Sequence, residues 1–167
     1  MDSLKFFHRR SNRLKGYDYS SPGSYFVTIC THNRKNSFGR IEKGKVQLNE
    51  FGRIGDKYWK KLLTHFSDVE IDTYVVMPNH VHAIITLAEE KVLPPHTLPE
   101  LGQVVAYYKY QSTKNINLAR EKPNHRVWQR SYFDHIIRNN KELRSYQQYI
   151  LENPLKWELD EYFAVDR

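Results

Sequence analysis

The segment His80–Leu87 constrains the fold most, because it has the pattern of a strand with one wholly apolar face. Successive side chains of a β-strand point to opposite faces of the sheet. One face therefore carries Val81, Ala83, Ile85 and Leu87, which can be buried, and the other carries His80 and His82. Two imidazoles side by side can bind a divalent ion, although the motif alone also fits two histidines that bind nothing.

A helix near the C-terminus supplies a second group of candidate residues. Leu143, Tyr146 and Ile150 recur at helical spacing in residues 141–153, and Pro154 ends the pattern. Tyr149 and Asn153 are four residues apart, so the phenol and the amide lie on one side of this helix. Tyr146 is a rival for any role of Tyr149, but an isoleucine stands four residues after it instead of an amide.

The sequence resembles the HUH single-strand DNA transposases that use one tyrosine. Two motifs carry the resemblance: a histidine, a hydrophobic residue and a histidine on a strand, and a tyrosine and an asparagine four residues apart on a late helix. Residues 127–139 and 149–157 are similar to the corresponding segments of the REP-associated tyrosine transposases. The resemblance extends from about Tyr17 to Trp157.

The resemblance implies a single-stranded DNA endonuclease and strand transferase, with Tyr149 as the nucleophile of a 5′ phosphotyrosine intermediate. It also implies a divalent metal, Mg²⁺ or Mn²⁺, held by His80, His82 and Asn153, and a DNA hairpin beside the cleavage site. It leaves open whether the protein acts as a monomer or a homodimer. Two other functions remain at this stage: a relaxase or replication-initiator nuclease, and a non-catalytic hairpin-binding module.

The charge of the chain suits a partner made of phosphates. Lys and Arg total 26 against 19 Asp and Glu, which gives a net charge of +7. Cations alternate with tyrosines near the N-terminus, as phosphate pairing and base stacking on an unpaired strand require. The candidate DNA-binding residues are Arg9, Arg10, Arg13, Lys15, Tyr17, Tyr19, Arg34, Lys35 and Arg130.

Length and composition predict one main domain in a reducing compartment. We expect a basic N-terminal arm over residues 1–20, an HUH transposase-like domain over 21–157 and an acidic tail over 158–167. Cys30 is the only cysteine, so no intramolecular disulfide can form. Apolar runs are too short to span a bilayer, and we expect a cytoplasmic protein without membrane contact.

The order of the predicted elements favours a ferredoxin-like α+β fold. Strands are expected over 25–31, 69–77, 80–87 and 127–138, helices over 51–66, 98–118 and 141–153, and a hairpin over 38–48. This is a βαββαβ order with an antiparallel sheet and one appended C-terminal helix, which carries Tyr149. If helices 51–66 and 98–118 cover the apolar face of the sheet, we expect the appended helix 141–153 to pack on the face that carries the histidines. Alternation in the second strand places Val69, Ile71, Thr73 and Val75 on one side.

Overall fold

A computed structural model describes residues 13–88 and 98–163. Its elements are β1 (Gly23–Cys30), η1 (His32–Arg34), β2 (Gly39–Glu42), β3 (Lys45–Leu48), α1 (Glu50–Lys60), α2 (Leu62–His65), β4 (Val69–Val76), β5 (His80–Leu87), α3 (Leu101–Ala119), β6 (Phe133–Ile137), α4 (Asn140–Glu152) and η2 (Trp157–Leu159). No helix in these residues is long and apolar enough to cross a membrane.

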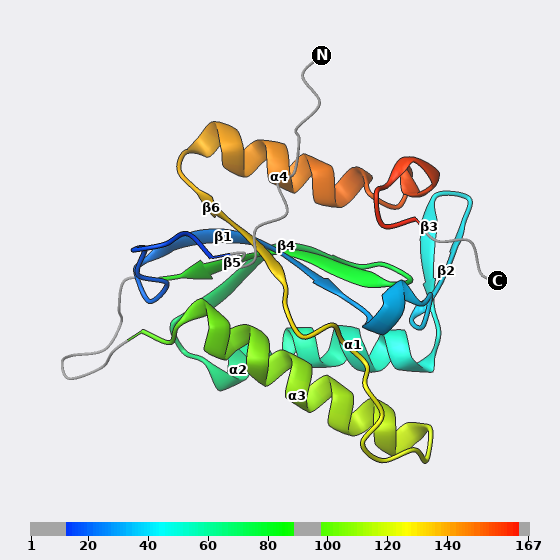
Figure 1. Ribbon diagram of the computed structural model, residues 1–167. Helices are drawn as coiled ribbons and strands as arrows, with labels where there is room; N and C mark the ends of the chain where they lie inside the picture. The colour runs from blue at the N-terminus through cyan, green and yellow to red at the C-terminus, as the bar shows by residue number, and fades with distance from the viewer. Residues whose placement is uncertain (1–12, 89–97, 164–167) are drawn as a thin grey trace.

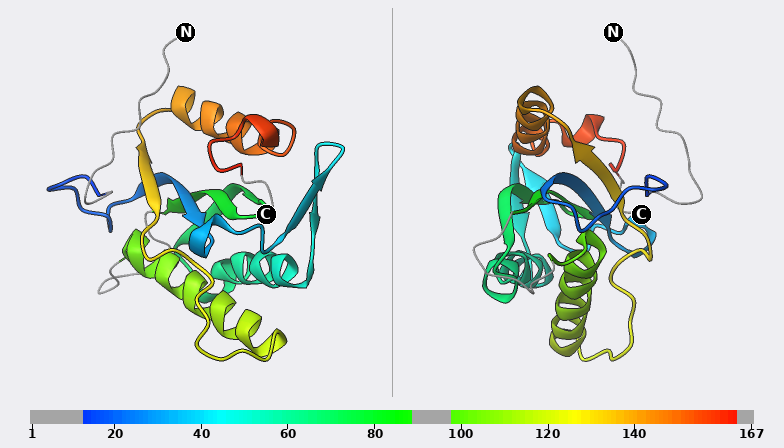
Figure 2. Two further views of the ribbon diagram at one scale, coloured as in Figure 1. Left: turned by 45° about the vertical axis from the view of Figure 1, so that its right-hand side comes forward. Right: turned by 90° about the vertical axis from the view of Figure 1, so that its left-hand side faces the viewer.

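The central sheet has four strands in the order β4-β5-β1-β6, and each neighbouring pair is antiparallel. Helices α1 and α3 lie on one face and α4 on the other, while β2 and β3 form a separate hairpin beside the sheet (Figures 1 and 2). This confirms the predicted α+β class with a four-stranded antiparallel sheet.

The main hydrophobic core lies between the sheet and helices α1 and α3. Trp59 of α1 and Tyr108 of α3 are fully buried and meet edge to face, with ring centroids 4.7 Å apart. The apolar row of β5 belongs to this core, as its alternation predicted: Val81, Ala83, Ile85 and Leu87. Burial of a large apolar side chain stabilises the fold by about 1.5–3 kcal/mol, so this face supplies most of the folding free energy.

The opposite face has a smaller apolar cluster under α4. Its buried members are Phe26, Ile84 and Ile150, with Leu143 and Tyr146 packed against them. Asn139 caps α4, because its side-chain oxygen accepts hydrogen bonds from the backbone N–H groups of Lys141 and Glu142. The histidine face is therefore covered by the helix that carries Tyr149.

Three predicted elements differ from the structure. A β-bulge between Ile71 and Tyr74 shifts the register of β4, so Val75 joins the histidine face and the expected alternation is wrong beyond the bulge. The predicted helix 51–66 is divided into α1 and α2 at Lys61. The predicted strand 127–138 is shortened to β6, because the preceding residues only bridge the end of β1, through the pair Thr31 and Trp128.

Candidate active site

Two buried histidines form the centre of the site. His80 and His82 lie at the start of β5, pair with Cys30 and Thr28 of β1, and are 0% and 1% exposed. Their ring centroids are 4.3 Å apart, as expected for alternate residues on one face of a strand. Burial lowers the pKa of His80 to about 3 and that of His82 well below its usual value. Both rings are therefore neutral, which is the form that binds metals.

Neighbouring polar groups orient the His80 ring. Asn79 donates its side-chain N–H groups to the backbone carbonyls of Arg34 and Tyr162, at 3.2 and 2.7 Å. Its side-chain oxygen therefore faces His80 Nδ1, at 2.8 Å, and accepts the proton on that nitrogen. The lone pair of His80 is left on Nε2, which is buried and has no hydrogen-bond partner among the described residues.

The His82 ring has a similar partner on its outer nitrogen. Its Nδ1 lies 2.8 Å from Thr28 Oγ1, and its Nε2 lies 3.3 Å from the Tyr149 hydroxyl. If Nδ1 donates to the threonine, Nε2 keeps a lone pair that can accept a proton or bind a metal.

Helix α4 brings Tyr149 and Asn153 to the histidines. The Tyr149 hydroxyl lies 3.3 Å from His82 Nε2, and its ring is 39% exposed, so it is accessible from solvent. Asn153 caps the C-terminal end of α4 and is 2% exposed. Within residues 13–88 and 98–163 its buried Oδ1 has no hydrogen-bond partner. The helical spacing of four puts both side chains on the side of α4 that faces the histidines.

Asp160 is the functional candidate that the sequence did not reveal. It follows η2, where the chain turns back beneath α4, and its carboxylate accepts hydrogen bonds from Asn153 Nδ2 at 2.5 Å and from the Tyr162 backbone N–H at 2.7 Å. One carboxylate oxygen and one ring nitrogen from each of His80 and His82 lie within 4.8 Å of one another. Asp160 belongs to the expected acidic tail, of which positions 158–163 are described, and Tyr162 of the same segment also approaches His80.

This donor set fits a divalent metal. A ring nitrogen from each of two neutral imidazoles and a carboxylate oxygen lie within 4.8 Å of one another, and the buried Asn153 amide is hydrogen bonded to the same Asp160 carboxylate. His80 Nε2 and Asn153 Oδ1 have no hydrogen-bond partner among the described residues. Buried polar atoms without partners are costly, so these two atoms favour a ligand. Two aromatic residues near Asp160 in the sequence, Trp157 and Tyr162, also approach His80 in the structure, with ring centroids 6.0 and 4.8 Å from that of the imidazole.

Electrostatics keep the Tyr149 phenol protonated without a bound cation. Burial raises its pKa, and the Asp160 and Glu161 carboxylates raise it further. Arg34 places its guanidinium 5.1 Å from the centroid of the Tyr162 ring. A nucleophilic role for Tyr149 therefore requires an added positive charge or a base.

The rival tyrosine packs in the apolar cluster. The Tyr146 ring is stacked on Phe26, with centroids 4.4 Å apart and an interplanar angle of 22°. It also contacts His135, at 5.2 Å between centroids. Unlike Tyr149, it makes no hydrogen bond to either His80 or His82.

The candidate DNA-binding residues near the N-terminus have different surroundings. Arg9 and Arg10 lie outside the described residues, and Lys15 is exposed. Arg13 contacts Tyr132 and Glu100, while Tyr17 lies edge to face with Tyr19. Tyr19 is only 5% exposed and belongs to the main core, which contradicts the expectation that it stacks on a DNA base. Its aromatic character serves packing at the end of the sheet.

The other candidates belong to two further segments of the chain. Arg34 and Lys35 lie at and after η1, next to the histidine end of the sheet. Arg130 is exposed in the connection between α3 and β6, two residues before Tyr132, the residue that Arg13 contacts.

Known proteins resemble this chain over most of its length. A family model described as IS200-like transposase matches residues 20–153. An uncharacterized protein of Haemophilus influenzae is 37% identical over 175 aligned residues, which cover 94% of each chain. The REP-associated tyrosine transposase of Escherichia coli is 32% identical over 138 residues, which cover 83% of this chain and 70% of that one.

A solved structure shows the same fold. It is that of a REP-associated tyrosine transposase bound to a REP hairpin, with a TM-score of 0.59 and 26% sequence identity. The match covers 86% of this chain and 73% of the other.

Proposed function

Since this chain belongs to the family of IS200-like transposases and is a tyrosine transposase, we propose that it cuts and rejoins single-stranded DNA beside a DNA hairpin. Tyr149 is the proposed nucleophile. The observation that carries the assignment is the position of its hydroxyl, 3.3 Å from His82 Nε2 at the edge of a buried set of metal-ligating atoms. A relaxase or initiator assignment is not favoured by the family match.

The proposed reaction is an exchange of phosphodiester bonds. Tyr149 Oη attacks a DNA phosphorus, the Tyr–O–P bond forms and the P–O3′ bond breaks. The phenolic proton is transferred by way of solvent to the leaving 3′ oxygen, and the protein keeps a 5′ phosphotyrosine. A DNA 3′ hydroxyl then attacks this phosphotyrosine, reforms a phosphodiester and regenerates the phenol, so that no oxidant or high-energy cofactor is needed.

Four side chains would hold a divalent ion, Mg²⁺ or Mn²⁺: His80 and His82 through Nε2, Asn153 through Oδ1, and Asp160 through its carboxylate. When bound, such an ion polarises a phosphate oxygen and offsets the field that raises the pKa of Tyr149. The chain itself supplies orientation. Asn79 and Thr28 fix the imidazoles, and Asp160 fixes the Asn153 amide with its oxygen free.

One chain supplies every proposed catalytic group. The Tyr149 hydroxyl lies beside His82 of the same chain, an arrangement that cleavage in cis would use. The solved relative bound to a REP hairpin supports a hairpin of inverted-repeat DNA as the partner of this chain.

The test uses the Tyr149→Phe variant, which removes one oxygen and keeps the ring packing. Single-stranded oligonucleotides carrying the inverted repeats that flank the coding sequence are incubated with Mn²⁺ and analysed on denaturing gels. We expect a covalent protein–DNA adduct with the unaltered protein and none with the variant, at equal hairpin binding. An adduct that persists in Tyr149→Phe would assign the nucleophile to another residue.

A further inference from the structure

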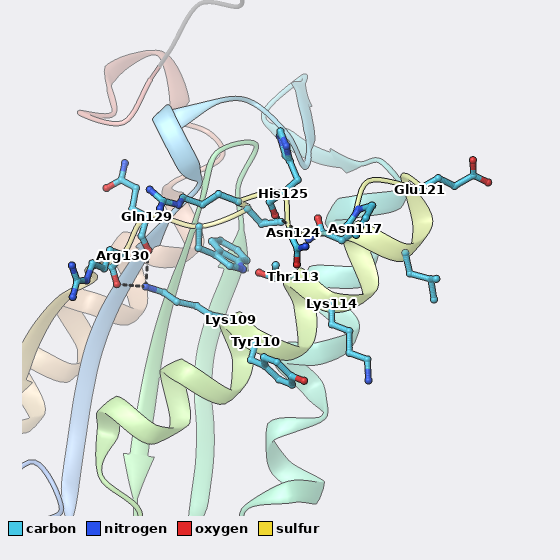
Figure 3. Close-up of a pocket in the computed structure, with 15 residues that line it drawn as sticks. Lys109, Tyr110, Thr113, Lys114, Asn117, Glu121, Asn124, His125, Gln129 and Arg130 are labelled. Carbon is cyan, nitrogen blue, oxygen red and sulfur yellow. Dashed lines mark hydrogen bonds between the residues drawn. The ribbon is translucent and has the colours of Figure 1, made fainter.

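A groove of about 940 Å³ lies between the second half of α3 and the connection 121–130. It is on the α3 side of the sheet, whereas the histidines face α4 (Figure 1). Figure 3 shows Lys109, Tyr110 and Lys114 on the helix and Asn124, His125, Gln129 and Arg130 on the connection. None of the groups proposed for catalysis lines this groove.

A half-buried lysine, Lys109, joins the two walls of the groove. Lys109 Nζ donates hydrogen bonds to the backbone carbonyls of Gln129 and Arg130, at 3.0 and 3.3 Å (Figure 3). It also donates to the Ser131 carbonyl, at 3.0 Å. The same connection is joined to β1, because the Gln129 backbone N–H donates to the Cys30 carbonyl at 2.9 Å. The groove is therefore a fixed feature of the fold.

The groove is positively charged. Lys114, Arg126 and Arg130 line it and form no ion pair with any described residue, and Glu121 is the one carboxylate in its lining. Unpaired cations in a concave surface attract polyanions and focus the field on them.

The groove also has apolar and aromatic surface. Tyr110 is 63% exposed and Leu118 77% exposed, and Val127 and Trp128 contribute to the lining. A duplex keeps its base faces stacked on one another, whereas an unpaired strand presents base faces that can stack on aromatic rings. The combination of cations with an exposed tyrosine therefore fits single-stranded nucleic acid.

A line of cations connects the groove to the catalytic end of the sheet. A second, smaller hollow shares His125, Arg126 and Val127 with the groove and is also lined by His32, Lys35 and Arg120. Arg34 follows His32 and stands over Tyr162, whose ring lies 4.8 Å from that of His80. Arg34, Lys35 and Arg130 thus belong to one continuous surface.

We propose that this groove binds a single-stranded segment of the same DNA molecule, several nucleotides away from the phosphate at Tyr149. The inference rests on the proposed function for its substrate, but it concerns a separate surface. Lys114, Arg126 and Arg130 pair with phosphates, Tyr110 stacks on a base, and the strand reaches the histidine site past Lys35 and Arg34.

The experiment compares three DNA probes: a 6-nucleotide oligothymidylate, a 24-nucleotide oligothymidylate and a 24-base-pair duplex. The variant Lys114→Ala/Arg126→Ala/Arg130→Ala removes the three exposed cations of the groove. The control variant Lys57→Ala/Lys60→Ala/Lys61→Ala removes three exposed cations from α1 and the residue after it, which line neither hollow. Affinities are measured at several salt concentrations.

We expect the groove variant to weaken binding of the 24-nucleotide strand and to make its slope of log K against log salt shallower by about two, since each lost contact contributes about 0.7. The 6-nucleotide strand, the duplex and the control variant should show much smaller changes. Tyr110→Ala should weaken the long strand about ten-fold, whereas Tyr110→Phe should not, because stacking needs the ring alone.

Equal changes in the groove and control variants, or a loss confined to the duplex, would overturn the proposal. So would equal affinities of Tyr110→Ala and Tyr110→Phe for the long strand. The covalent adduct formed by Tyr149 on a short substrate is measured in parallel. If the groove variant binds the long strand normally and still forms the adduct, the groove proposal is rejected but the proposed function is not. If the adduct persists in Tyr149→Phe, the proposed function is rejected.

Discussion

The two faces of the sheet bury very different groups. Toward α1 and α3 the strands present an apolar row that packs around Trp59 and Tyr108. Toward α4 the described residues bury only Phe26, Ile84 and Ile150 as an apolar cluster, and beside it lie two histidines and an asparagine. A single strand, β5, contributes to both faces through alternate residues.

The difference teaches how stability and chemistry are divided in this fold. A close-packed apolar face gains free energy from each side chain that it removes from water. The α4 face instead buries His80 Nε2 and Asn153 Oδ1, which have no partner among the described residues and so cost stability until something binds them. The apolar face can stabilise the α4 face because β5 contributes residues to both faces.

The largest effect is expected from one truncation on each face of β5. Ile85→Ala should lower the free energy of unfolding by about 2–5 kcal/mol, because it opens a cavity in the main core. It should keep the stabilisation by Mn²⁺, which is about 2.7 kcal/mol at a concentration 100 times the dissociation constant. His82→Ala should lose that stabilisation together with cleavage. Denaturant unfolding with and without Mn²⁺ measures both quantities.

The opposite result would show that stability and metal binding are not separated between the two faces of the sheet. If Mn²⁺ stabilised His82→Ala as strongly as the unaltered protein, the metal would have to bind elsewhere. His80→Ala provides an independent repeat of the test, because it removes the other imidazole from the same site.

The next effect separates two neighbouring carboxylates. Asp160→Asn should weaken Mn²⁺ binding about 10–100-fold, the range found when supporting groups of metal sites are removed. Glu161→Gln makes the same change of charge at the adjacent, exposed position and should leave the affinity nearly unchanged. Calorimetric titration of the metal-free protein with Mn²⁺ distinguishes the two variants.

Asp160 can act as a ligand or only through the Asn153 amide, to which it is hydrogen bonded. The double variant Asn153→Ala/Asp160→Asn decides between these roles. A ligand should still lower the affinity in the Asn153→Ala background, whereas an orienting group should have no further effect there.

Local patterns in the sequence predict much of this molecule. Alternation over residues 80–87 assigns the two faces of β5, and the spacing of Tyr149 and Asn153 places both on one side of α4. Both patterns lie within single elements, where side-chain direction follows from backbone geometry alone. The order of the elements was then sufficient for the ferredoxin-like sheet.

Contacts between distant segments were not accessible in this way. The chain turns back after α4 and brings Asp160 to the histidines, although no periodic pattern covers those residues. The bulge in β4 is also set by its neighbours: Tyr74 donates to Asp56 of α1, and Asp72 accepts from Gln147 of α4. Tyr19 was expected on the surface because cations surround it in the sequence, but its ring fills the end of the core.

The smallest effect is expected from Tyr146→Phe, which sharpens the comparison within the α4 face itself. Tyr146 and Tyr149 are one turn apart, and both rings contact Phe26, but only the Tyr149 hydroxyl is hydrogen bonded to His82. Removal of the Tyr146 hydroxyl keeps its ring stacked on Phe26, so the rate of adduct formation and the free energy of unfolding should both stay close to those of the unaltered protein. Single-turnover gels and denaturant unfolding test this directly. A variant that loses the adduct but remains folded would show that the chemistry of this face extends into its apolar cluster, and the division between packing and reacting tyrosines would have to be abandoned.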